Sequence, residues 1–162
     1  MNKIRFISDL HFGHKNMAIR RGFKDEFEHD EYIIKQWNSV VNKRDTVFIL
    51  GDITMERSKW YFRLDSLFGY KKVILGNHDK LSCVPELLKY VNSVGGMLNL
   101  KNFNSKNIVL THCPVHPSEF NYKVDYNIHG HVHENTLDDK RYINVSAEVI
   151  DYKPKTFEEL NV

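Results

Sequence analysis

The feature that most constrains this sequence is a series of short apolar segments that each end in Asp, Asn or His. Five predicted strands run directly into such groups, at Asp9-Leu10-His11, Gly51-Asp52, Gly76-Asn77-His78-Asp79, Thr111-His112 and Gly130-His131-Val132-His133. In open α/β sheets the loops converge at the carboxyl ends of the strands, where the backbone is held rigidly and ligand sites collect. The sequence therefore predicts a fold that brings these polar groups to one shared site.

Apolar runs and helical spacing alternate along the first half of the chain, and strands dominate the second half. Strands are predicted at residues 4–7, 46–50, 71–75, 97–100, 107–111, 126–129 and 142–149. Helices are predicted at residues 30–41 with Asp30 as N-cap, from Ser58 to Phe68, and near Pro85 to Tyr90. Predicted turns lie at Gly95-Gly96 and residues 101–106, and residues 152–160 form an extended tail with a final helical turn. This order of elements indicates a layered α/β domain with mixed sheets.

The spacing of the polar groups has a physical reason. Residues i and i+2 of an extended chain point to the same side, so Asp9/His11 and His131/His133 each present two ligands together. Carboxylate and amide oxygens mixed with imidazole nitrogens suit Mn, Fe, Zn or Ni. Glycine before the polar group lets the backbone approach a bound anion with no Cβ in the way, and this occurs at positions 51, 76 and 130.

Composition places the chain among ordinary globular proteins. Hydrophobic residues make up 41% and charged residues 27%, and a length of 162 residues predicts a single domain spanning residues 1–162. The net charge is only +2, and no basic block is long enough for a nucleic-acid-binding arm. The apolar stretch at the N-terminus is interrupted by Arg5 and Asp9, unlike a signal peptide or a membrane span, so we expect a cytoplasmic protein.

Taken in this order, the blocks DxH, GD, GNHD, a lone H and GHxH resemble the calcineurin-like metallophosphoesterase superfamily. They extend from Asp9 to His133 and so cover most of the chain. The segments SDLHFGHKN, WNSVVNKRDTVFILGD and NVSAEVIDYKPKTFEEL look like the short single-domain bacterial and phage members. The resemblance implies a four-layer αββα sandwich, in which helices flank two mixed β-sheets. In a chain this short we expect a reduced helical layer beside the second sheet.

The resemblance also implies two divalent metal ions, with manganese favoured, that share a bridging hydroxide. His78 would stabilise charge on the phosphate and assist the departure of the leaving group, with Asp79 orienting its imidazole. A purely supporting role for His78 is the alternative. One ion would be held by Asp9, His11, Asp52 and His133, and the other by Asp52, Asn77, His112 and His131.

The implied function is a metal-dependent phosphoesterase that hydrolyses phosphodiesters, small phosphate esters or nucleotides. The alternatives are a phosphomonoesterase or a nuclease of the same fold, and a non-catalytic binding module that keeps the fold. A module that had lost catalysis would be expected to have substituted ligands, whereas the ligand set and His78 are intact here. Short loops leave little room for a cap domain, which favours small accessible substrates over phosphoproteins. Nucleic acid is a less favoured substrate than these small molecules.

Several residues near these motifs have two interpretations. His14 is a candidate for the substrate pocket or for loop support, and Asn16 belongs to the same HFGHKN segment. Arg20 or Arg21 either binds a phosphate, which a guanidinium matches in geometry, or forms an exposed basic pair. His129 is either a core histidine or a support for a metal ligand.

The remaining His, Cys and Trp residues are assigned to ordinary positions. His29 lies in an acidic, polar stretch and is expected on the surface. A substrate role is not favoured for His116, which follows Pro114 closely in the sequence. Cys113 lacks a CxxC partner and is expected at the edge of the polar site rather than on a metal. Trp37 and Trp60 occur at helical spacing and are expected in the core.

Overall fold

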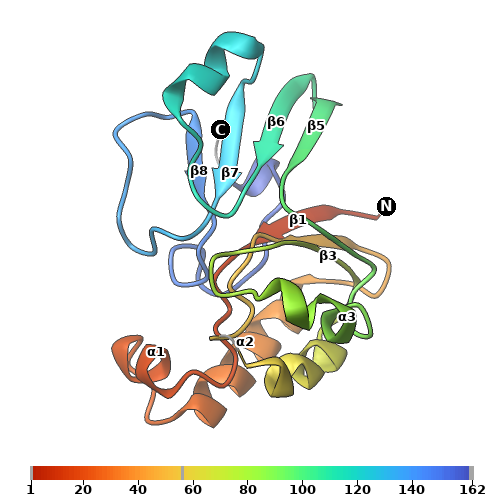
Figure 1. Cartoon of the computed structure of the whole chain (residues 1–162), viewed down its shortest axis with the longest axis vertical. Helices are drawn as coiled ribbons and strands as arrows, with labels where there is room; N and C mark the ends of the chain where they lie inside the picture. Colours follow the sequence, from red (N-terminus) through yellow and green to blue (C-terminus); the bar gives the residue numbers. More distant parts are fainter. Residues whose placement is uncertain (1, 56, 161–162) are drawn as a thin grey trace.

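Two four-stranded β-sheets and a layer of helices make up the fold in the computed structural model, which describes residues 2–55 and 57–160. The first sheet consists, in sequence order, of β1 (Ile4–Ile7), β2 (Thr46–Ile49), β3 (Tyr70–Ile74) and β4 (Ser93–Gly95). Every neighbouring pair of these strands is parallel. The carboxyl ends of β1, β2 and β3 therefore lie along one edge of the sheet (Figure 1).

The second sheet is mixed. An antiparallel hairpin is formed by β5 (Leu98–Phe103) and β6 (Lys106–Leu110), and β7 (Tyr126–His129) and β8 (Tyr142–Asn144) extend it in parallel. The chain then returns to the first sheet, where Val145 and Ala147 bond with the backbone of Ser8. Lys155 forms an antiparallel bridge with Phe6 of β1. The C-terminal segment therefore connects the two sheets.

Helices cover the face of the first sheet that points away from the second sheet (Figure 1). They are α1 (Lys15–Arg20), α2 (Glu26–Val40), the 3₁₀-helices η1 (Ser58–Ser66) and η2 (Leu81–Cys83), and α3 (Val84–Leu87). The short 3₁₀-helix η3 (Pro117–Tyr122) lies beside the second sheet, and η4 (Glu158–Leu160) ends the described chain. The predicted α/β sandwich, with a reduced helical layer on the second sheet, is confirmed. Every described helix is too short or too polar to span a bilayer.

Helix α2 begins earlier than the sequence predicted. Its N-cap is Asp25, whose carboxylate accepts a backbone hydrogen bond three residues on, and the predicted cap Asp30 lies inside the helix. The expected surface position of His29 is wrong, because His29 and Asp30 are both fully buried. His29 stands one helical turn before Ile33 and two before Trp37, so all three lie on the buried face of α2.

Other element boundaries also differ from the prediction. The segment from Ser58 is a 3₁₀-helix rather than an α-helix, and Gly95 ends strand β4 rather than forming a turn. Strand β8 stops at Asn144 rather than at Val149. It is short because the residues that follow leave the second sheet and pair with Ser8 at the end of β1.

An apolar core lies between the sheets and beneath the helices. Trp37 is fully buried there, as predicted, and its Nε1–H donates a hydrogen bond of 2.9 Å to the carbonyl oxygen of Phe68. Trp60 is only partly buried and stacks on the exposed ring of Phe62, with 6.0 Å between centroids. The prediction of a core position is therefore confirmed for Trp37 and holds only in part for Trp60.

Replacing Trp37 with alanine should lower the free energy of unfolding by about 3–5 kcal/mol, because the change empties a large buried volume and unpairs the Phe68 carbonyl. Urea denaturation measures this as a lower midpoint with an unchanged slope. Phe27→Ala is the control on the same helix, since the Phe27 side chain is 55% exposed, and its cost should stay below about 1 kcal/mol. Equal losses in the two variants would contradict this description of the core.

Candidate metal centre

The side chains that follow the strands meet where β1 and β2 end. His11 lies between two carboxylates, with its Nε2 3.9 Å from Asp9 Oδ1 and 3.8 Å from Asp52 Oδ2. The His133 ring stacks on the His11 ring with 5.4 Å between centroids. One potential ligand atom from each of Asp9, His11 and His133 lies within 4.8 Å of the others. Oxygen and nitrogen atoms grouped in this way suit a divalent metal ion.

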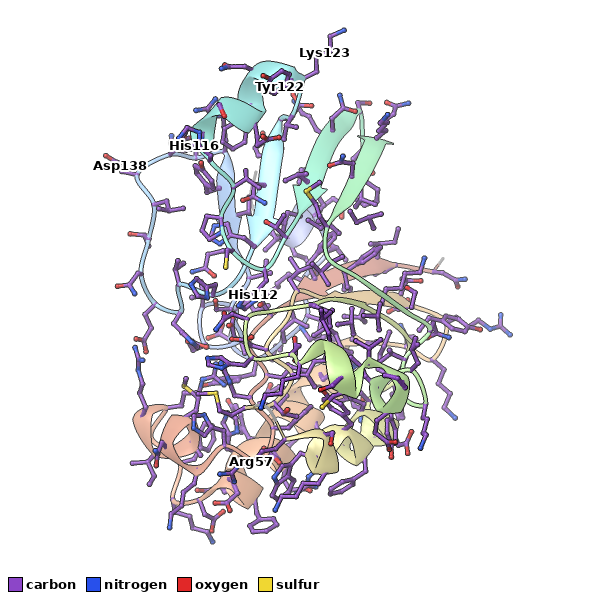
Figure 2. The ribbon with its side chains drawn as sticks, viewed as in Figure 1. Arg57, His112, His116, Tyr122, Lys123 and Asp138 are labelled. Carbon is purple, nitrogen blue, oxygen red and sulfur yellow. The ribbon has the colours of Figure 1, made fainter. Side chains whose placement is uncertain are left out.

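A second group of side chains shares Asp52 with the first. His112 Nε2 lies 3.4 Å from Asp52 Oδ2, the same oxygen that His11 approaches. Asn77 Oδ1 lies 2.9 Å from both His112 Nε2 and His131 Nδ1. Figure 2 shows His112 near the middle of the molecule, between the helices and the second sheet. The predicted metal ligands therefore converge in two groups that one carboxylate joins.

Burial leaves several of these atoms in need of a partner. Asp9, His11 and Asp52 are buried, whereas Asn77 and His131 reach the surface. Among the described residues, Asp9 Oδ1 and both ring nitrogens of His11 have no hydrogen-bond partner. A buried carboxylate oxygen without a partner costs free energy, and a divalent cation would satisfy it together with one His11 nitrogen. The residues present therefore fit a metal ion.

Most of the predicted ligands have a left-handed backbone conformation. The φ angle is 58° at Asp9, 50° at His11, 54° at Asp52, 70° at His131 and 53° at His133. Residues other than glycine rarely adopt this conformation, which costs about 1–3 kcal/mol each. Hydrogen bonds between loops hold it, since the His11 N–H donates to the Asp52 carbonyl and the His131 N–H to Asp9 Oδ2, both at 3.0 Å. Strain that surrounding contacts maintain is characteristic of functional sites.

The glycines that precede the predicted ligands make room for other predicted ligands. A Cβ at Gly76 would lie 2.2 Å from Asp52 Oδ1. A Cβ at Gly51, where φ is +87°, would lie 2.6 Å from His112 Nδ1. These positions, like Gly130, let the loops of the predicted ligands pack against one another, and close approach to a bound anion stays a prediction.

The family of the chain follows from comparison with known proteins. The family model described as "Calcineurin-like phosphoesterase" matches residues 2–135, which include every predicted metal ligand. The chain belongs to the calcineurin-like phosphoesterase family. It is therefore a phosphoester hydrolase of a metal-dependent family, as the sequence predicted.

Relatives of this phosphoesterase occur in an archaeon and in a phage. An uncharacterised protein of Methanocaldococcus jannaschii is 35% identical over 166 residues, which cover 95% of this chain and 86% of that protein. The Gene 66 protein of Mycobacterium phage L5 is 46% identical over 84 residues, which cover 49% of this chain and 41% of that protein. The archaeal relative thus matches the phosphoesterase along nearly its whole length.

Two solved structures share its fold. A protein of unknown function from Aquifex aeolicus superimposes with a TM-score of 0.80 and 26% identity, over 99% of this chain and 98% of that one. A protein described as a novel archaeal phosphodiesterase gives a TM-score of 0.54 and 20% identity, over 88% of this chain and 82% of that one. At the identity of the second pair, the likeness shows the fold alone.

Burial also sets the protonation of the ligands in the phosphoesterase. Burial lowers the pKa of His11 to about 2, and the charge of Arg21 acts in the same direction. The imidazole is therefore neutral and keeps the lone pair that a metal ligand needs. Burial is the largest single influence on Asp52 and tends to raise its pKa, but the contacts with His112, the His78 N–H and His11 together lower the pKa below its usual value. Asp52 is therefore a carboxylate.

His78 lies next to the predicted metal ligands, and Asp79 is bonded to the backbone of the loops that carry them. The partly exposed His78 ring lies 6.1 Å from the His11 ring, and the His78 N–H donates to Asp52 Oδ1 at 3.0 Å. The buried Asp79 carboxylate accepts hydrogen bonds of 2.8–3.2 Å from the backbone N–H groups of Asp52, Ile53 and Gly76. Asp79 thus fixes the loop that carries Asp52, because three backbone donors surround its two oxygens.

The predicted substrate-binding residues lie at different distances from the site. His14 is beside it, with its ring 5.9 Å from the His11 ring. The His14 Nδ1 atom is buried and has no hydrogen-bond partner among the described residues. Asn16 and Arg20 are exposed on α1, and Arg20 pairs with Glu134 at 3.3 Å. His14 is therefore the member of this group that is nearest to the metal ligands by its contacts.

Cys113 lies closer to the metal ligands than predicted. Its exposed thiol is within 4.8 Å of a ring nitrogen of His112 and of His131.

Two further histidines are not among the predicted ligands. His129 is buried in the core, with Nδ1 2.9 Å from the carbonyl oxygen of the next residue. His116 is exposed, accepts the N–H of a residue in η3 and lies well away from His112 in Figure 2. His116 therefore lies apart from the candidate metal centre.

The residues that support the predicted ligands were not predicted from the sequence. Glu148 Oε1 lies 2.6 Å from His133 Nδ1, and Glu148 also pairs with Arg21, whose side chain is 1% exposed. The alternative of an exposed basic pair is therefore wrong for Arg21 and holds for Arg20 alone. One signal was present in the sequence, because Glu148 is the charged residue of an otherwise uncharged segment, residues 145–150.

Gly130→Ala should weaken metal binding by the phosphoesterase about 100-fold. A Cβ at Gly130 would lie 1.9 Å from Ser8 Oγ and 2.4 Å from Asp9 Oδ2, so the Asp9 carboxylate must move away from its position. Disturbing the surroundings of a metal ligand typically costs about 10–100-fold in affinity, and this clash is at the severe end. Isothermal titration calorimetry with Mn²⁺ measures the change. Gly96→Ala is the control, since a Cβ at Gly96 meets no atom within 4 Å. Equal affinities in the two variants would contradict the assignment.

Proposed function

We propose that this phosphoesterase hydrolyses phosphodiesters and other small phosphate esters, nucleotides included, with two divalent metal ions bound side by side. The observation that carries the proposal is the position of Asp52 Oδ2. This oxygen lies 3.8 Å from His11 Nε2 and 3.4 Å from His112 Nε2. A carboxylate between two groups of ligands suits a pair of ions about 3.5–4 Å apart.

Each of the two groups of side chains is assigned to one ion. Mixed oxygen and imidazole donors suit Mn²⁺, and also Fe, Zn and Ni. When bound, the ions supply a water that is deprotonated near neutral pH and positive charge for the phosphoryl oxygens. The first ion is assigned to Asp9, His11, Asp52 and His133, and the second to Asp52, Asn77, His112 and His131.

His78 is assigned the role of acting on the phosphate. Its ring is partly exposed and lies 6.1 Å from the His11 ring, so it can reach a phosphate at the edge of the metal ligands. A protonated His78 stabilises the negative charge that develops on the phosphoryl oxygens and donates a proton to the leaving group. His14, whose ring lies 5.9 Å from the His11 ring, is a further candidate for substrate contact, and Asn16 and Arg20 are candidates for contact with a longer substrate.

Residues 1–162 are taken to act as one domain. Small, accessible substrates are favoured because Asn77 and His131 are exposed. The archaeal protein of similar fold is described as a phosphodiesterase, which supports a diester substrate over a monoester. The net charge of +2 gives little attraction for the phosphates of an extended nucleic acid, which argues against a nuclease. A complete set of converging ligands with His78 beside it argues against a binding module without catalysis.

Hydrolysis assays with metal-stripped protein test the proposal. Bis-p-nitrophenyl phosphate and p-nitrophenyl phosphate are supplied with Mn²⁺, Ni²⁺, Zn²⁺, Mg²⁺ or no added ion. We expect turnover only with added metal, and faster turnover of the diester. Faster turnover of the monoester would change the assignment to a phosphatase that uses the same site. Two ions bound without turnover of either ester would favour the binding module.

Asp52→Asn should lower kcat for the diester at least about 1,000-fold, because it removes the negative charge that both ions share. At about 1.36 kcal/mol per tenfold change in rate, this corresponds to a barrier higher by about 4 kcal/mol. Steady-state kinetics at saturating Mn²⁺ measure the loss, and circular dichroism checks the fold. Asp138→Asn is the control, since Asp138 is exposed on an outer loop (Figure 2) and its variant should stay within about twofold of the wild type. Unchanged turnover in folded Asp52→Asn would contradict the proposed site.

A further inference from the structure

A buried guanidinium lies directly behind the first metal-binding loop. The Arg21 side chain is 1% exposed, although Arg21 follows helix α1 in a polar part of the sequence. Its Nη2 donates to the carbonyl oxygen of Asp9 at 2.8 Å, and its Nη1 to that of Leu10 at 3.4 Å. The same Nη2 lies 2.5 Å from Glu148 Oε2. One cation therefore contacts the ligand loop of β1 and an acidic residue from the far end of the chain.

The other oxygen of Glu148 reaches a metal ligand. Glu148 Oε1 lies 2.6 Å from His133 Nδ1. A carboxylate can only accept, so Nδ1 carries the proton and the lone pair of Nε2 is free to bind a metal ion. Glu148 thus fixes both the tautomer and the orientation of the His133 ring. The chain Arg21–Glu148–His133 connects residues that are 127 and 15 positions apart in the sequence.

The network continues behind Arg21 to the other end of the first loop. Arg21 Nη1 lies 3.0 Å from His29 Nε2, and because arginine cannot accept, His29 accepts there and its Nδ1–H donates to Asp30 Oδ1 at 3.3 Å. Both oxygens of Asp30 accept the N–H of Gly13 at 3.1 Å. The loop is therefore held at Asp9 by Arg21 and at Gly13 by Asp30, and His11 lies between these two points.

In the second group, His112 and the Asp52 loop have supports that do not include Arg21 or Glu148, whereas the His131 N–H donates to Asp9 Oδ2. His112 Nδ1 lies 2.7 Å from the carbonyl oxygen of Leu50, and the loop of Asp52 is held by the Asp79 carboxylate. None of the contacts given above for Arg21 or Glu148 involves Asn77, His112 or His131. Loss of the Arg21–Glu148 pair should therefore disturb one group of ligands and spare the other.

We infer that Glu148 and Arg21 are positioning residues for the metal ion held by Asp9, His11 and His133. Glu148 presents the Nε2 lone pair of His133, and Arg21 holds Glu148 and the Asp9 backbone in one rigid unit. The inference rests on the proposed two-ion function, since it assigns a support to only one of the two ions. It also gives His29 and Asp30, which the sequence did not connect with the site, a place in the same unit.

Calorimetric titration of the metal-free full chain with Mn²⁺ tests the inference through binding rather than activity. Glu148→Gln keeps the shape of the side chain, but a neutral amide cannot accept from His133 and Arg21 as the carboxylate does. We expect one Mn²⁺ dissociation constant to rise about 10–100-fold, the usual effect of losing such a support, while the other changes less than about threefold. Equal weakening of both ions, or of neither, would overturn the inference.

Glu134→Gln is the matched control. Glu134 directly follows His133 and also pairs with an arginine, Arg20, but this pair is exposed to solvent, at 55% for the arginine and 63% for the glutamate side chain. Neither dissociation constant should change in this variant. A loss of affinity equal to that of Glu148→Gln would mean that negative charge near the site, rather than the buried contact, determines the effect.

Arg21→Lys is the second variant, used also if Glu148→Gln does not fold. A lysine keeps the charge but cannot contact two carbonyl groups and a carboxylate at once, so the binding of the same ion should be weakened.

Double variants identify which ion is affected. In a His112→Ala background Glu148→Gln should keep its full effect on Mn²⁺ affinity, and in a His11→Ala background it should have none. The reverse pattern would overturn the inference. If the wild type binds a single ion, the two-ion function fails, and the inference then stands or falls on whether Glu148→Gln weakens that ion.

Discussion

The burial of two carboxylates, Asp9 and Asp52, at the ends of the adjacent parallel strands β1 and β2 is the constraint on which the structure depends. Like charges that are buried close together repel one another, and each has also lost its hydration. The protein offsets this with hydrogen-bond donors from other loops. Asp9 Oδ2 accepts from the His131 N–H and from Ser146 Oγ, and Asp52 Oδ1 accepts from the His78 N–H. The need to solvate two carboxylates therefore holds together segments from both halves of the chain.

The other oxygen of each carboxylate is the one assigned to the proposed ions. Asp9 Oδ1 has no hydrogen-bond partner among the described residues, and Asp52 Oδ2 faces the imidazoles of His11 and His112. The same loops have left-handed φ angles at their ligand residues. A ligand present at 100 times its dissociation constant stabilises the folded state by about 2.7 kcal/mol, which is comparable with the strain of one or two such residues. Metal binding can thus offset part of the cost of forming the site.

The parts of the fold and site that the sequence predicted are those encoded by short segments. Apolar β-branched runs predicted β1, β2 and β3 to within a residue or two, and the polar residues after them gave the converging groups at Asp9, Asp52 and Asn77. These predictions succeeded because parallel neighbours bring strand ends to one edge whatever the rest of the chain does. The 3₁₀ geometry from Ser58 and the early end of β8 were not predictable in this way, since packing and the contact with Ser8 decide them.

The residues behind the ligands escaped prediction for a different reason. Arg20 and Arg21 are the same residue type at adjacent positions, and local sequence cannot distinguish the exposed one from the buried one. The difference is the partner: Glu134 is exposed, whereas Glu148 lies in a segment that pairs with the end of β1. A largely buried glutamate that supports His133 needs a cation beside it, and Arg21 is the one whose guanidinium also reaches the Asp9 carbonyl. Charge balance inside the fold, rather than any local pattern, therefore assigns Arg21 to the site.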